Sequence, residues 1–178
     1  DIKNLKENNL IEFKKSKGGL PNSLWESYSA FANSNGGTIV LGIDEPQKNV
    51  FESAKLTESE VLELKKRFWD TINNTQKVSV NILVDKDVYV DDYDGFPILV
   101  IKVRRANRFE KPVHINNNVY SGTYRRNHEG DYHCTKSEID LMIIDSSNQS
   151  NDKTCLEEFA LEDLNLESIL SYKQMLKA

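Results

Sequence analysis

The segment from residue 104 to residue 111 is rich in cationic side chains and has few acidic neighbours. Its cations are Arg104, Arg105, Arg108 and Lys111. Arginine and lysine in a loop suit contact with the phosphate oxygens of a nucleic acid, which positions the ligand without reading its sequence. The segment therefore predicts a phosphate contact. The alternative is a solvated surface, or salt bridges to acidic segments of the same chain.

A second cationic group directly follows an aromatic side chain. Tyr124 precedes Arg125 and Arg126, and an aromatic ring beside cations suits stacking of an unpaired base or the lining of a groove. Near the start of the chain, Lys14 and Lys15 complete the set of residues that we expect to bind nucleic acid.

The distribution of charge favours one basic face. The formal net charge of −5 argues against a nonspecific coat for nucleic acid. Residues 101–136, however, hold eight Lys and Arg against three Asp and Glu, whereas residues 137–178 hold three against nine. A protein with an acidic total can still present a basic surface.

Metal, disulfide and membrane chemistry have little support in the sequence. Cys134 and Cys155 are too few for a disulfide framework or a zinc site. His128 and His133 lack a second pair at ligand spacing, so we interpret them as surface residues. With no long apolar run and no signal peptide, we expect a cytoplasmic protein without membrane contact, trimmed from a longer chain.

The elements that must position these side chains alternate between strand and helix. Periodicity predicts strands at 10–14, 38–43, 78–84, 97–103, 113–115, 118–120 and 123–126, and helices at 22–32, 57–72, 136–145 and 159–176. Capping boxes begin two of the helices. This order predicts an α/β (α+β) fold with a mixed central sheet in residues 1–145. Residues 146–178 are expected to form a polar linker and a helical tail that leads to a further region.

The stretch from residue 30 to residue 44 is predicted to run from helix to turn to buried strand. Gly36 and Gly37 allow the turn, and the apolar, β-branched run after them suits a strand that is buried on both faces. Asp44 is expected where that strand leaves the core. Because these glycines precede a strand rather than a helix, they argue against a phosphate loop for a nucleotide.

Three blocks of sequence together resemble the AlbA-like domain of the Schlafen family. The blocks are residues 7–16 with a Glu-Phe-Lys string, residues 29–44 with an Asn-Ser-Asn-Gly-Gly string, and residues 122–135 with a Tyr-x-Arg segment. The resemblance implies nucleic-acid binding, as in bacterial transcriptional regulators. In animal Schlafens it also implies cleavage of structured RNA by three acidic residues, which match Glu7, Glu12 and Asp44.

Three clustered carboxylates would repel one another unless a proton or a cation relieved the repulsion. Mg²⁺ or Mn²⁺ would suit Glu7, Glu12 and Asp44, because hard cations take oxygen ligands and can activate a nucleophile beside a phosphate. Lys14 could then stabilise the developing charge. The alternative is that Glu7 ends a helical turn, Glu12 is an exposed strand residue and Asp44 forms a turn.

Three functions thus remain open from the sequence. The first is a module that binds the backbone of DNA or RNA, and the second is a metal-dependent nuclease. The third is a module for interaction or oligomerisation, in which the basic segment meets an acidic surface. An exposed edge strand could pair two copies into a homodimer.

Overall fold

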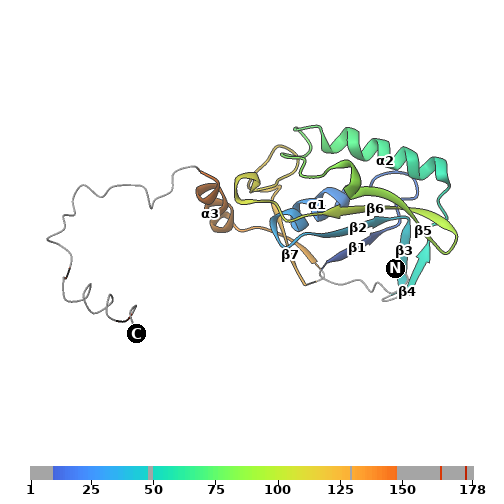
Figure 1. The fold of residues 1–178 in the computed structure, drawn as a ribbon, viewed down its shortest axis with the longest axis horizontal. Helices are drawn as coiled ribbons and strands as arrows, with labels where there is room; N and C mark the ends of the chain where they lie inside the picture. Colours follow the sequence, from blue (N-terminus) through green and yellow to red (C-terminus); the bar gives the residue numbers. More distant parts are fainter. Residues whose placement is uncertain (1–9, 48–49, 129, 148–164, 166–174, 176–178) are drawn as a thin grey trace. The chain divides into compact units, whose positions relative to one another are not determined.

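The computed structural model describes residues 10–47, 50–128, 130–147, 165 and 175. The chain divides into two compact units, residues 1–146 and 147–178. The first unit combines three α-helices with a mixed sheet, which confirms the predicted fold class (Figure 1). In the described part of the chain, no helix is both long enough and apolar enough to cross a membrane.

A four-stranded sheet forms the centre of the first unit (Figure 1). Its strands, in spatial order, are β1 (Ile11–Lys14), β2 (Gly37–Leu41), β6 (Phe96–Val103) and β5 (Val88–Tyr93). The β1–β2 pair is parallel, and the other pairs are antiparallel. A parallel pair needs a crossover connection, which α1 (Ser23–Asn33) supplies.

Both faces of β2 are buried, as its continuous apolar run predicts. Ile39 and Leu41 face a core shared with α1 and α2 (Glu58–Ile72). Val40 faces a second, smaller cluster with Ile98 on β6. Side chains therefore pack on both faces of β2, and this packing fixes the position of the turn before it.

A hairpin follows β2. Strands β3 (Ile43–Gln47) and β4 (Val50–Ser53) pair with each other. The predicted strand 38–43 breaks at Gly42, whose φ of +105° ends β2. A side chain there would also meet Leu56 at 3.0 Å and Ile98 at 3.2 Å. Asp44 therefore lies within β3, opposite Glu52, rather than directly after a strand at 38–43. Ile43 is buried and Asp44 only partly so, which places Asp44 where the chain leaves the core.

Residues 78–84 do not form the predicted strand. Only an isolated bridge joins Val78 to Ile115. Beyond it, the Tyr28 hydroxyl of α1 donates to the carbonyl of Val80 and accepts from the N–H of Ile82, at 3.1 and 3.0 Å. A helix side chain thus takes the place of a neighbouring strand.

The strands predicted at 113–115 and 118–120 are likewise wrong, because the segment that contains them forms only isolated bridges. The strand predicted at 123–126 is observed as β7 (Tyr124–Asn127). It pairs with an unpredicted strand, β8 (Gly130–His133), and short 3₁₀ helices occur at η2 (Asp85–Asp87) and η3 (Arg108–Glu110).

Both capping boxes form as predicted. Thr57 and Glu60 cap α2. Apolar residues three or four apart predict a buried stripe on this helix, and its members are all buried: Val61, Leu64, Phe68 and Ile72. Thr135 and Glu138 cap α3 (Lys136–Ser146) in the same way. The same spacing predicts a buried stripe of Ile139, Met142 and Ile143 on α3, which is wrong in part, because Ile143 is 40% exposed. The tail helix predicted at 159–176 lies almost entirely outside the described residues.

Candidate nucleic-acid interface

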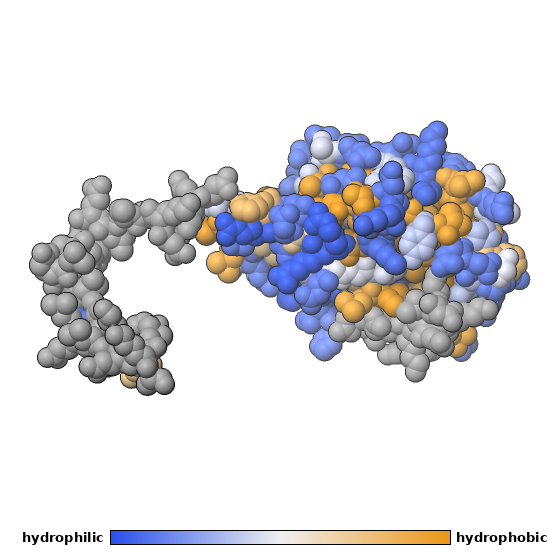
Figure 2. Space-filling view, viewed as in Figure 1, coloured by the Kyte–Doolittle hydropathy of each residue, from blue (hydrophilic) through white to orange (hydrophobic). Residues whose placement is uncertain are grey.

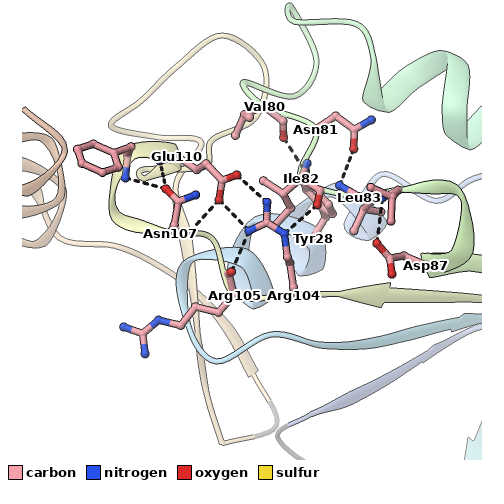
Figure 3. Close-up of polar contacts among 12 residues, drawn as sticks. Tyr28, Val80, Asn81, Ile82, Leu83, Asp87, Arg104, Arg105, Asn107 and Glu110 are labelled. Atoms are coloured by element: carbon pink, nitrogen blue, oxygen red, sulfur yellow. Dashed lines mark hydrogen bonds and ion pairs between the residues drawn. The ribbon is translucent and has the colours of Figure 1, made fainter.

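Arg104 forms hydrogen bonds that hold residues 104–111, the basic segment, in place. Its guanidinium donates to both carboxylate oxygens of Glu110, at 2.8 and 2.6 Å, and its Nε donates to the carbonyl of Ile82 at 3.1 Å (Figure 3). Hydrogen bonding to Glu110 raises the pKa of Arg104, and the same contact lowers the pKa of Glu110. Arg104 thus has partners within the chain, and it holds η3 against the segment near residue 82.

The Arg104–Glu110 ion pair predicts that the free energy of unfolding falls at acidic pH. Because the pKa of Glu110 is lower in the folded state, its carboxylate stabilises the fold above the unfolded pKa of about 4.3, and that contribution is lost as the pH falls through the folded value. We expect Glu110→Gln to be less stable than the parent near neutral pH and to lose less stability on acidification. Urea unfolding at neutral and at acidic pH measures both differences in stability. The control is Glu63→Gln, which removes a carboxylate from an exposed ion pair on α2. Equal acid sensitivity of Glu110→Gln and the parent would contradict the assignment.

The neighbouring cations lie around a depression. Arg105, Arg108 and Lys111 line a depression of about 360 Å³, together with Asp145 at the end of α3. The guanidinium of Arg105 projects away from the Arg104 network (Figure 3). Arg105 and Arg108 are exposed, and among the described residues neither forms a salt bridge.

Lys111 links the depression to the end of α1. Its Nζ donates to the carbonyl of Asn33 at 2.6 Å, which satisfies an orphan acceptor of the helix. Burial lowers the pKa of Lys111, and the nearby charge of Arg105 lowers it further. An anion bound between Lys111 and Arg105 would favour the charged form of Lys111. Figure 2 shows strongly hydrophilic side chains gathered on the face beside α3.

Arg126 lies inside the fold rather than on this surface. Its side chain is 4% exposed and forms ion pairs with Glu12 at 3.0 Å and Asp131 at 2.8 Å. Its guanidinium also lies over the ring of Phe31, 5.0 Å from the centroid. Lys14 is nearly as buried and binds the other oxygen of Glu12 at 3.0 Å. Two cations and two carboxylates therefore form a balanced cluster that joins β1, β7 and β8.

The described carboxylates do not fit a metal centre. Both oxygens of Glu12 already accept from cations, and Asp44 pairs with Lys15 at 2.6 Å. Within the described residues, no group of three His, Cys, Asp or Glu is placed to hold a metal. Glu7 lies outside the described residues, so its predicted role stays a prediction. The charges of Glu12 and Asp44 are balanced by lysine and arginine side chains.

Tyr124 and Arg125, which the sequence predicts to contact nucleic acid, each contact another residue of the chain. The ring of Tyr124 lies against His133, with 4.3 Å between ring centroids. Arg125 forms a half-exposed ion pair with Glu138 at 3.1 Å. Both residues lie on β7, and their contacts with nucleic acid remain predictions.

The turn after α1 connects the basic depression to a second hollow, which the sequence did not reveal. This hollow measures about 440 Å³ and is lined by Leu10, Ser34, Asn35, Gly36, Arg126, Asn127 and His128. A Cβ on Gly36 would lie 2.7 Å from the carbonyl of Val103 and 3.1 Å from the N–H of Arg105. The turn therefore packs directly on the backbone of the basic segment. The Asn-Ser-Asn-Gly-Gly string marked the turn, but not the hollow beside it.

The chain is similar to a known protein family and to two solved structures. Residues 7–135 match a family model described as Schlafen, AlbA_2. The N-terminal domain of a RecG-related protein from Nitrosomonas europaea is 22% identical, covers 75% of this chain and 88% of its own, and has a TM-score of 0.54. A protein from Corynebacterium diphtheriae is 15% identical over 75% of this chain and 23% of its own, with a TM-score of 0.47. No curated protein matches significantly.

Proposed function

Because the chain belongs to the Schlafen AlbA_2 family, we propose that it is a nucleic-acid-binding module. It holds the phosphate backbone at the depression lined by Arg105, Arg108 and Lys111. The proposed setting is a bacterial transcriptional regulator that uses this module to hold DNA or RNA. The structural neighbour from Nitrosomonas europaea is named in relation to an ATP-dependent DNA helicase, which is compatible with this setting.

The observation that carries the proposal is the unbalanced charge of the depression. Elsewhere in the described residues, Lys14, Arg104 and Arg126 are each paired with carboxylates of the chain. Among the described residues that line the depression, Arg105, Arg108 and Lys111 are accompanied by one carboxylate, that of Asp145. Phosphate oxygens would supply the missing negative charge, and charge-assisted hydrogen bonds to arginine are strong. We favour binding over cleavage, because the described members of the acidic set are paired with cations.

Removing two of these cations tests the phosphate contact. We expect Arg105→Gln/Arg108→Gln to bind a single-stranded oligonucleotide more weakly, and the slope of log affinity against log salt to fall by about 1.4, or about 0.7 for each lost contact. Fluorescence anisotropy over a series of salt concentrations measures both quantities.

The matched control removes the same charge elsewhere. Lys66→Gln/Lys55→Gln also deletes two exposed cations, on α2 and in the segment before it. We expect the salt slope of this control to stay near that of the parent. If both double variants lost the same affinity, the binding would reflect total charge rather than this depression.

A further inference from the structure

The hollow beside the turn after α1 differs in chemistry from the basic depression. We propose that it is a binding site for one unpaired nucleobase of a single-stranded nucleic acid. This inference rests on the proposed function and goes beyond it, because it assigns a preference for single strands over duplex.

The lining of the hollow suits a base rather than a phosphate. Among the described residues that line it, the one arginine or lysine is Arg126, whose charge is offset by Glu12 and Asp131. The amides of Asn35 and Asn127 are exposed at the hollow and can both donate and accept hydrogen bonds. Such groups match the polar edge of a base. A volume of about 440 Å³ lies within the usual range of small-ligand sites.

One apolar and one aromatic side chain border these amides. Leu10 is 51% exposed at the hollow, and His128 is exposed there too. Imidazole rings and apolar side chains offer flat or deformable surfaces on which an unstacked base can rest. The hollow thus combines the two contacts by which proteins hold single-stranded bases, a stacking surface and polar groups for the base edge.

The backbone at His128 has a positive φ, which is uncommon for residues other than glycine. The residue lies in the loop between Asn127 and Gly130, which are paired across the β7–β8 hairpin, and its φ is +51°. Tight hairpin loops favour glycine or asparagine at such angles. A non-glycine residue held in this region costs free energy, and such residues gather at ligand sites. The loop therefore carries an imidazole where glycine would fit more easily.

The hollow and the depression are placed to act on one strand. Gly36 lines the hollow, and it packs against the backbone of Arg105, which lines the depression. A strand whose phosphates lie on the depression can direct a neighbouring base across this turn. In a duplex, that base is paired and stacked, and removing it from the helix costs free energy. The arrangement therefore favours single strands.

Three probes that carry similar phosphates test the proposal. They are a fluorescent single-stranded oligodeoxynucleotide of about 12 nucleotides, the same strand in duplex, and a strand of the same length made of abasic nucleotides. We expect the single strand to bind the full chain roughly tenfold more tightly than the abasic strand at the same salt concentration. Equal affinity for those two probes, or tighter binding of the duplex, would overturn the base site while leaving the phosphate contact in place. No binding of any probe would overturn both proposals.

A variant of His128 removes the ring without straining the backbone. Glycine accepts a positive φ readily, so His128→Gly should fold at least as stably as the parent. We expect it to bind the single strand about five- to tenfold more weakly and the abasic strand unchanged.

The control for this variant is Asn117→Gly, which relieves another positive φ, of +50°, away from the hollow. It should keep the parent's affinity for every probe. If His128→Gly also kept it, while Asn35→Ala/Asn127→Ala did likewise, the hollow would not be a base site.

Discussion

Arg126→Met is expected to reduce the free energy of unfolding by about 3–5 kcal/mol. The variant keeps much of the side-chain volume but leaves Glu12 and Asp131 in a poorly hydrated site, with Lys14 as the remaining cation of the cluster. Removing one member of a buried ion pair is costly because the other charge stays buried. Urea unfolding of the full chain, followed by circular dichroism, gives the difference.

The neighbouring residue provides the control. Arg125→Met deletes the same charge from the same strand, but its pair with Glu138 is more than one-third exposed on both sides. Exposed pairs contribute about 0–1 kcal/mol, so this variant should unfold close to the parent. Equal losses for the two variants would mean that Arg126 acts as a surface residue, and that the buried cluster does not hold the hairpin to β1.

The contrast between these two arginines shows what the sequence could and could not reveal. Arg125 and Arg126 were equally good candidates for phosphate contact, because both follow Tyr124. Which of them points inward depends on the β7–β8 register, which places Arg126 opposite Asp131. Its other partner, Glu12, lies on β1, more than a hundred residues earlier in the chain. Local patterns carry no information on such pairs.

The same limit separates the elements that were predicted well from those that were not. The α2 capping box and stripe depend on residues three or four apart, and both were confirmed. The split of the predicted strand at Gly42 depends on Leu56 and Ile98 packing against it. Residues 78–84 alternate as a strand should, yet Tyr28 of α1 takes the hydrogen bonds that a neighbouring strand would have made.

The basic segment likewise shows a feature that the sequence predicts and a detail that only the fold determines. Its composition correctly marked a cationic segment, but only the fold separates Arg104, tied to Glu110, from Arg105, which projects outward. The sequence therefore predicted the location of the candidate interface, and the tertiary contacts determine which side chains remain available to a ligand.

Asn33→Ala is the second variant for which we expect a large effect. Asn33 is buried at the end of α1, and its side chain makes four hydrogen bonds. Its Oδ1 accepts from the N–H of Val113 at 2.9 Å, and its Nδ2 donates to the carbonyls of Val113 and Tyr124 and to the Ser29 hydroxyl. Alanine leaves at least the N–H of Val113 and the carbonyl of Tyr124 without this partner. We expect a loss of about 2–5 kcal/mol in the free energy of unfolding.

We also expect weaker binding at the interface, because Asn33 ties Val113, which lies just after the basic segment, to Tyr124 of β7. A matched control is Asn73→Ala, which removes an exposed asparagine directly after α2 and should change the free energy of unfolding by about 0.5 kcal/mol. Below the urea concentration at which Asn33→Ala unfolds, we expect weaker oligonucleotide binding than for Asn73→Ala. If Asn33→Ala were as stable as the control, the string that ends α1 would serve only the turn. If it were unstable but bound normally, the depression would be positioned without it.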